Sequence, residues 1–208
     1  MKPLRIDIIR RLILFAIFFV TGPLTSSRAQ PAGIDVSGQN FVGDFYCEPS
    51  AIPRPGILLL GGSEGGRPIK HWPMLLAQNG YAVPAVAYFK ERGLPNTLEM
   101  IPLEYVDTPI AWLRNHTNVV PGSIFVWGGS KGAELTLLLA SRKPEIQGII
   151  ALSPCSVVWA GIADNRFSAK SSLSLHGQPL PFVPYDLSAG FEQNDPLATR
   201  KLYERSLA

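Results

Sequence analysis

The stretch from Ile124 to Ala140 constrains the fold of this chain more than any other. Its first four residues, 124–127, are all apolar and predict a buried strand, bounded upstream by the turn-forming pair Pro121-Gly122. Its last eight residues, 133–140, are good helix formers and predict a helix. Between the two lies the pentapeptide GGSKG, in which the middle residue is Ser130.

This pentapeptide fits the pattern G-x-S-x-G of a nucleophile elbow, a tight turn between a strand and a helix. In such a turn the serine takes a strained backbone conformation, and Gly128 and Gly132 avoid side chains that would collide. Ser130 is therefore the candidate nucleophile, and the N–H of Lys131, at a helix N-terminus, is a candidate oxyanion donor. A glycine-rich connection that only permits close packing is the alternative interpretation.

A second glycine-rich loop follows another short apolar run. Residues 57–60 are apolar at every position, which predicts a central parallel strand, and they lead directly into GGSEGG at 61–66. Glycines let backbone N–H groups approach a ligand, so the loop can supply the second half of an oxyanion hole through the amide of Ser63 or Glu64. The Gly-Lys-Ser/Thr signature of a phosphate-binding P-loop is absent, and a plain tight turn is the remaining alternative.

Strands and helices are predicted to alternate along the chain. This order predicts an α/β fold with a mostly parallel sheet and helices on both faces. Pro84 predicts a bulge or irregularity in its strand. From residue 153 the alternation stops, and 164–190 is expected to be a lid or insertion over the active edge of the sheet. The predicted strands are 41–47, 57–60, 81–88, 124–127 and 147–152, and the predicted helices are 68–79, 98–115, 133–140 and 197–207.

The first 29 residues differ in composition from the remainder. They hold five of the 19 basic residues and one of the 16 acidic residues, so the rest of the chain is nearly neutral and offers no basic face for nucleic acid. A basic start, an apolar core at 12–20 and small residues up to Ala29 predict a signal peptide that is cleaved near Ala29, and hence an exported protein. An uncleaved membrane anchor is the alternative. Residues 30–40 are predicted as a linker and 41–208 as one domain.

Two cysteines, Cys47 and Cys155, would meet an oxidising compartment after export. Metal sites need clustered ligands, and the cysteine and histidine positions are not clustered. We therefore expect no metal and no cofactor, and two free thiols rather than a disulfide.

A reactive serine needs a histidine that accepts its proton and an acid that orients the histidine. The only histidine downstream of Ser130 is His176, and it follows no predicted strand. We therefore interpret His176 as a surface or lid residue, and a role as the catalytic base is the less favoured alternative. His71 and His116 are expected to pack or lie at the surface, so the sequence contains no complete triad that can be recognised.

Four segments, FVGDFYCEP, ILLLGGSEGG, VWGGSKGAELTLLLASRKPEIQGIIALSPCSVVW and GQPLPFVPY, resemble the C-terminal domain of acyl-CoA thioester hydrolases and bile-acid-CoA:amino-acid N-acyltransferases. That domain is a relative of dienelactone hydrolase among the α/β-hydrolases. The resemblance implies that Ser130 is the nucleophile that accepts the acyl group. It also implies an aspartate and a histidine after two further strands, and the chain ends before both. We therefore expect a C-terminally truncated domain that lacks its last strands and could self-associate through an unpaired sheet edge.

The leading hypothesis is an exported serine acyl hydrolase of the thioesterase or esterase type, impaired because its acid and histidine are missing. Acyl-CoA is an intracellular metabolite, so the expected substrate is another small ester or thioester. The alternatives are a non-catalytic remnant or binding protein, and acyl transfer to an amine. No nucleic-acid partner is expected, and no membrane contact beyond the leader.

Overall fold

The computed structural model describes residues 31–164, 166–186 and 196–207 of the chain. These residues belong to a single unit that begins at Pro31. The predicted signal peptide, residues 1–29, lies outside the described residues, so export stays a prediction from the sequence. In the described ranges no helix has the length and apolar character needed to cross a membrane.

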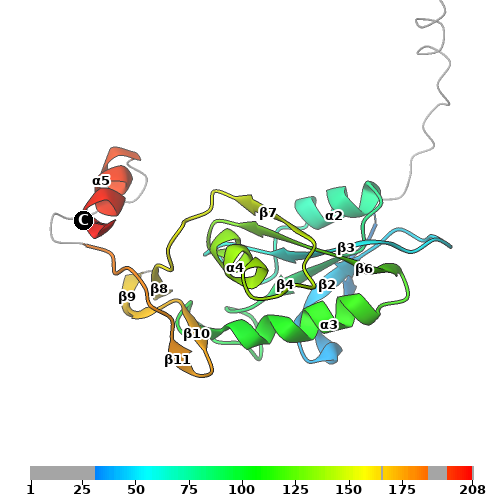
Figure 1. Ribbon diagram of the computed structural model, residues 1–208, viewed down its shortest axis with the longest axis horizontal. Helices are drawn as coiled ribbons and strands as arrows, with labels where there is room; N and C mark the ends of the chain where they lie inside the picture. Colours follow the sequence, from blue (N-terminus) through cyan, green and yellow to red (C-terminus); the bar gives the residue numbers. More distant parts are fainter. Residues whose placement is uncertain (1–30, 165, 187–195, 208) are drawn as a thin grey trace, which may run out of the picture. The chain divides into compact units, whose positions relative to one another are not determined.

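A six-stranded mixed sheet forms the centre of the described chain (Figure 1). The pairs β4–β3, β3–β6 and β6–β7 are parallel, whereas β1 and β2 run antiparallel to their neighbours. The predicted α/β fold with a mostly parallel sheet is therefore confirmed. In order across the sheet, the strands are β1 (Ile34–Asp35), β2 (Val42–Tyr46), β4 (Val83–Ala87), β3 (Arg54–Leu60), β6 (Val119–Gly129) and β7 (Gly148–Leu152).

Helices cover both faces of this sheet. Every position of the strand over 57–60 is apolar and successive side chains point to opposite faces, so both faces need to be covered. Leu58 and Leu60 pack in one core cluster with residues of α3 (Asp107–Asn115) and α4 (Lys131–Ala140). Ile57 and Leu59 pack in a second cluster with Ala77 of α2 (His71–Gln78). The sheet thus lies between α2 on one side and α3 and α4 on the other (Figure 1).

The helix predicted over 98–115 begins later than expected. Ile101–Pro102 form the short strand β5, Leu103–Val106 form the 3-10 helix η2, and α3 starts only at Asp107. Pro102 gives the reason, since a proline disfavours the helical conformation of the residue before it, and Pro102 itself is extended, with φ −66° and ψ 127°. The helix prediction was therefore wrong for residues 98–106.

Pro84 and Pro121 both lie inside strands rather than at their ends. Pro121-Gly122, predicted as a turn before the strand, belongs to β6, which starts five residues earlier than its apolar run and shifts register against β3 in this region. Gly122 accommodates the irregularity with a φ of 77°. Pro84 pairs with Phe45 of β2 in regular register. On its other side the bridges to β3 resume only at Ala85, so the predicted irregularity is a gap in that ladder and not a bulge.

The segment after residue 153 contains strands that its composition did not predict. β8 (Ala160–Ala163) pairs with β9 (Arg166–Ser171), and β10 (Leu173–Leu175) pairs with β11 (Gln178–Pro179) and, in parallel, with β5. The expectation of an irregular segment was wrong for its described part. The predicted final helix is present as α5 (Pro196–Leu207).

The segment predicted as a linker, residues 30–40, takes part in the fold. Its Ile34–Asp35 form β1, which pairs with β2, and Ser37–Gln39 form the 3-10 helix η1. At the opposite edge of the described sheet, β7 exposes Ile150 and Leu152 by 44% and 41%. Self-association through this edge stays a prediction.

Candidate active site

Ser130 lies at the junction of β6 and α4 in the conformation expected of an elbow. Its φ of 51° and ψ of −115° place a non-glycine residue in a sparsely populated region, which is a strained backbone conformation. The Ser130 N–H donates to the carbonyl of Leu152 at 2.9 Å, and the Ser130 carbonyl accepts from the N–H of Ala133 at 2.9 Å. These bonds to β7 and to the first turn of α4 hold the residue in place, while the residue itself is exposed.

Gly128 and Gly132 have no room for a side chain. A Cβ on Gly128 would lie 2.2 Å from the carbonyl oxygen of Gly132, and a Cβ on Gly132 would lie 2.3 Å from the carbonyl oxygen of Gly61. Both obstacles are backbone atoms, which cannot move aside as a flexible side chain would. The close packing that we considered as an alternative to the elbow is therefore part of the same arrangement.

The glycine loop 61–66 passes directly beside Ser130. A Cβ on Gly62 would lie 3.3 Å from the Cβ of Ser130. The Gly62 N–H donates to Oε1 of Glu64 at 2.8 Å, and the Tyr88 hydroxyl donates to the carbonyls of Gly61 and Gly62 at 2.8 and 3.2 Å. Burial, reinforced by the charges of Glu64 and Glu134, raises the pKa of Tyr88. Tyr88 therefore stays a neutral hydrogen-bond donor to the loop.

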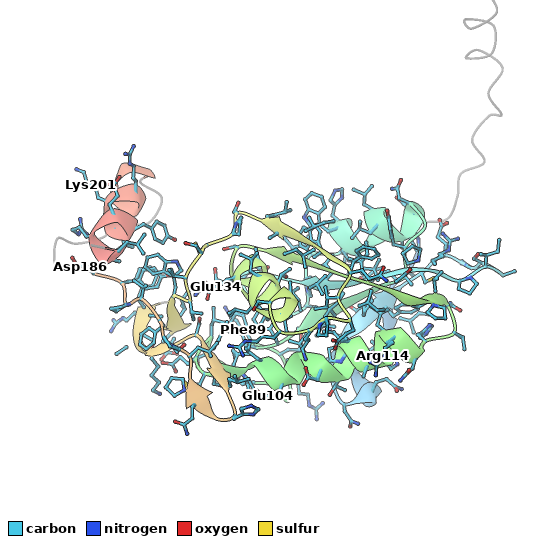
Figure 2. The ribbon with its side chains drawn as sticks, viewed as in Figure 1. Phe89, Glu104, Arg114, Glu134, Asp186 and Lys201 are labelled. Carbon is cyan, nitrogen blue, oxygen red and sulfur yellow. The ribbon has the colours of Figure 1, made fainter. Side chains whose placement is uncertain are left out.

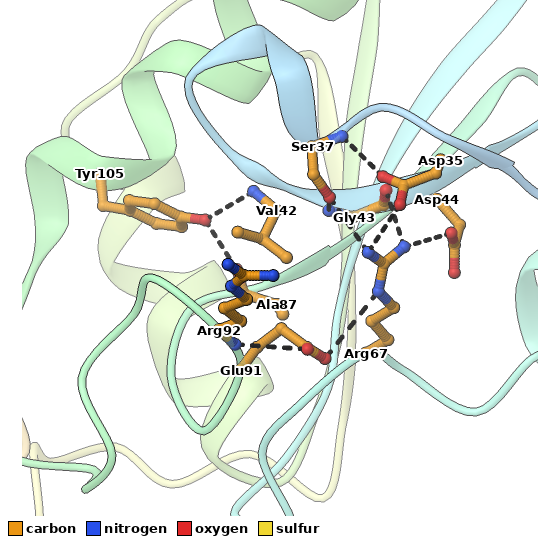
Figure 3. A network of polar contacts seen from close by, with 10 residues as sticks. All are labelled: Asp35, Ser37, Val42, Gly43, Asp44, Arg67, Ala87, Glu91, Arg92 and Tyr105. Atoms are coloured by element: carbon orange, nitrogen blue, oxygen red, sulfur yellow. Dashed lines mark hydrogen bonds and ion pairs between the residues drawn. The ribbon is translucent and has the colours of Figure 1, made fainter.

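Arg67 fixes the end of the loop to the first two strands (Figure 3). Its guanidinium contacts the carboxylates of Asp44 and of Asp35, the latter at 3.1 Å, and lies 3.8 Å from that of Glu91. Hydrogen bonds from Ser37, assisted by Arg67, lower the pKa of Asp35 to about 2. The segment that we expected to be a linker thus supports the glycine loop.

A pocket of about 280 Å³ opens at Ser130. Ser63 is not among its lining residues, whereas Glu64 is. Its lining residues come from the ends of β3, β6 and β7, from the glycine loop and from the start of α2: Leu59, Gly61, Gly62, Glu64, Pro68, Ile69, Trp72, Trp127, Gly129, Ser130, Leu152 and Ser153. No described residue of 164–186 lines it, so that segment does not form the lid that we expected over this site.

The Lys131 side chain does not line the pocket but is buried in a polar cluster of its own. Its Nζ lies 3.1 Å from Oε2 of Glu134 and within hydrogen-bonding distance of the Ser172 hydroxyl, 3.2 Å, and the Trp159 carbonyl, 3.4 Å. Glu134 of α4 is labelled in Figure 2. Burial lowers the pKa of Lys131 and raises the pKa of Glu134. This cluster joins the helix that follows Ser130 to the segment of β8 and β10.

None of the three histidines contacts Ser130. The Nδ1 of His176 lies 3.0 Å from the carboxylate of Glu104, beside the β10–β11 hairpin (Figure 2). His116 packs against Phe45 and Trp112, with ring centroids 4.6 Å apart in both cases, and His71 packs against the ring of Trp72. Within the described ranges the Ser130 hydroxyl makes no hydrogen bond, so the structure joins the serine to no acid and base there.

Neither a metal centre nor a disulfide lies among the described residues. Cys47 and Cys155 are both half-buried free thiols. The described part of the chain has no group of three or more histidine, cysteine, aspartate or glutamate side chains placed to hold a metal ion.

The apolar residues that form the pocket wall were not identified from the sequence. Trp127 lies near the end of β6 and Trp72 lies in the first turn of α2, with ring centroids 5.6 Å apart. Their positions next to the two glycine motifs were a usable signal, since carboxyl ends of adjacent parallel strands meet at one edge of the sheet. Tyr88 follows the next strand at the same edge.

The sequence of this chain is similar to sequences of known proteins. Residues 101–190 match the family model described as BAAT / Acyl-CoA thioester hydrolase C terminal. The chain is 37% identical over 141 residues to human acyl-coenzyme A thioesterase 1, covering 68% of this chain and 31% of that protein. It is 35% identical over 113 residues to mouse acyl-coenzyme A thioesterase 5, covering 54% of this chain and 27% of that protein. The chain thus spans less than a third of the length of these curated relatives.

Among solved structures, a mutant of the esterase Est22 matches with a TM-score of 0.51 and 17% identity over 78% of this chain and 55% of that chain. At this identity the likeness bears on the fold alone, and it agrees with the mixed sheet and two helical layers described above. The described chain is therefore an α/β-hydrolase-type domain similar to the C-terminal domain of acyl-CoA thioester hydrolases and BAAT.

Proposed function

We propose that this protein is an acyl hydrolase of the thioesterase or esterase type in which Ser130 attacks the carbonyl carbon of the substrate. The observation that carries the proposal is the strained Ser130 at the strand–helix junction, exposed at a pocket and flanked by the glycine loop. Acyl-enzyme chemistry needs a serine that is presented in this way, next to backbone donors for the oxyanion. The similarity to acyl-coenzyme A thioesterases supports the same reaction class.

The N–H of Lys131 is the first proposed oxyanion donor. It stands at the first residue of α4, where a backbone N–H has no partner within the helix. The glycine loop supplies the second donor, through the amide of Ser63 or Glu64, since the Gly62 amide is already bonded to the Glu64 carboxylate.

The 208-residue chain is proposed to work far more slowly than an enzyme with a complete triad. All three of its histidines have other neighbours, so no imidazole takes the proton from Ser130. Oxyanion stabilisation and substrate binding without a triad still give roughly 10³- to 10⁴-fold acceleration over water. The same observation favours a second candidate, a protein that binds an acyl compound without turning it over.

Hydrolysis of p-nitrophenyl butyrate by the wild-type chain and by Ser130→Ala separates the two candidates. We expect slow release of p-nitrophenol by the wild type together with a butyryl adduct on Ser130 that mass spectrometry detects, and no adduct on Ser130→Ala, because the variant lacks the attacking hydroxyl. His176→Ala serves as the control and is expected to match the wild type, since His176 bonds to Glu104. A wild type that carries no butyryl adduct on Ser130 would refute the hydrolase and leave the binding protein.

A further inference from the structure

The pocket at Ser130 combines an apolar wall with a single charge. Six of its lining side chains are apolar: Leu59, Pro68, Ile69, Trp72, Trp127 and Leu152. Among the described residues that line it, Glu64 is the only one with an ionisable side chain, and none is a lysine or an arginine. An alkyl group therefore finds apolar contact there, whereas a negatively charged group finds no counterion.

The carboxylate of Glu64 is held in the pocket by backbone geometry. Its Oε1 accepts the Gly62 N–H at 2.8 Å. Its Oε2 lies 2.7 Å from the point where a Cβ on Gly62 would stand, and the Cβ of Ser130 lies 3.3 Å from the same point. The negative charge is thus fixed immediately beside the serine. Arg67, the nearest cation to Glu64 along the chain, is paired with Asp35 and Asp44, and Lys131 is paired with Glu134 in a separate buried cluster.

The size and the rim of the pocket limit the acyl group further. Its volume of about 280 Å³ is just below the range of small-molecule sites, which is about 300 to 1,000 Å³. The rim residues Ile69, Trp72 and Leu152 are exposed by 68%, 41% and 41%, so an alkyl chain that leaves the pocket continues over apolar surface. These three side chains are uncharged and offer a terminal carboxylate no counterion.

We propose that Glu64 and the Trp72–Trp127 wall make this pocket selective for uncharged, apolar acyl groups of short or medium length, and that Glu64 rejects acyl groups that end in a carboxylate. The inference rests on the proposed function, because that function places the acyl carbonyl at Ser130. Two like charges in a partly desolvated pocket repel each other strongly enough to decide between acyl groups of equal length.

Two esters with the same six-carbon acyl chain test the proposal: methyl hexanoate, which is neutral, and monomethyl adipate, which ends in a carboxylate. Binding is measured by calorimetry on Ser130→Ala, which cannot turn either ester over. We expect methyl hexanoate to bind about tenfold or more tightly than monomethyl adipate. In the same background, Glu64→Gln should raise the affinity for monomethyl adipate by about fivefold to tenfold and leave the affinity for methyl hexanoate unchanged. Glutamine keeps an oxygen that can accept the Gly62 N–H, so the loop geometry is preserved.

Glu145→Gln is the matched control, because it changes the net charge equally and Glu145 does not line the pocket. It is expected to leave both affinities unchanged. Trp72→Ala is expected to weaken methyl hexanoate, because it removes part of the apolar wall. Equal binding of the two esters, or a preference that Glu64→Gln leaves intact, would overturn the inference.

The result of this binding test can be distinguished from the result of the test for hydrolysis. Selective binding by Ser130→Ala, together with no hydrolysis by the wild type, would keep the inference and remove the hydrolase. Hydrolysis of both esters at equal rates, with no selectivity in binding, would keep the hydrolase and remove the inference.

Discussion

Gly132→Ala is expected to destabilise the protein by about 3 kcal/mol or more, because the added methyl group meets backbone atoms that cannot move aside. The added Cβ would lie 2.3 Å from the carbonyl oxygen of Gly61 and 2.6 Å from that of Leu60. Both oxygens belong to the backbone at the end of β3, so relief requires that α4 move away from the sheet. Urea unfolding followed by circular dichroism measures the loss.

Gly38→Ala is the matched control for this substitution. It adds the same methyl group in the 3-10 helix η1, where nothing lies within 4 Å of the new Cβ, and the change in stability is expected to be within about 0.5 kcal/mol. If Gly132→Ala unfolded at the same urea concentration as the wild type, the close contact between the elbow and the glycine loop would be refuted.

Lys131→Met is expected to cost about 3 to 5 kcal/mol, because it leaves the buried carboxylate of Glu134 without its cation. The two side chains are exposed by only 8% and 4%, and their charged atoms are 3.1 Å apart. The double variant Lys131→Met with Glu134→Gln removes the isolated charge, so its loss should be smaller than that of Lys131→Met alone. Arg200→Met, which breaks an exposed ion pair with Glu204, is the control and should cost about 0.5 kcal/mol or less.

The stability of Lys131→Met should also depend on pH in a defined direction. Burial raises the pKa of Glu134 above its usual 4.5, and loss of the neighbouring ammonium removes the main opposing effect. A group whose pKa is raised on folding binds more protons in the folded state, so stability falls as pH rises through the raised pKa. The variant should therefore be less impaired at pH 5 than at pH 8, and an equal loss at both would contradict a buried, unpaired Glu134.

The sequence was sufficient to predict the strand, the tight turn and the helix around Ser130. The apolar run before GGSKG, the helix formers after it and the spacing of Gly128 and Gly132 are local features, and each has a direct steric consequence in the structure. The alternation of strands and helices likewise predicted a mostly parallel sheet with helices on both faces. Those predictions need only patterns among residues that are close in sequence and the general rules by which strands are connected.

The remaining features depend on contacts between distant residues. The side chain of Glu64 folds back onto Gly62, and Arg67 reaches Asp35 and Asp44, which no periodicity indicates. β5 forms because Ile101 pairs with Leu173, a partner 72 residues away. The i, i+3 spacing of Lys131 and Glu134 is compatible with a helical ion pair, but the burial of the pair depends on the segment of β8 and β10 that packs beside α4.

Labelling of the full chain with a small alkyl fluorophosphonate, followed by peptide mass spectrometry, tests the role of Ser130 most directly. The reagent phosphonylates a serine only where a nucleophilic oxygen and oxyanion donors meet, so the account predicts a single adduct on Ser130, formed slowly because no histidine assists. The adduct should be absent from Ser130→Ala and unchanged in His176→Ala. A folded protein that remains unlabelled, or that carries its adduct on another residue, would contradict the assignment of Ser130 as the nucleophile.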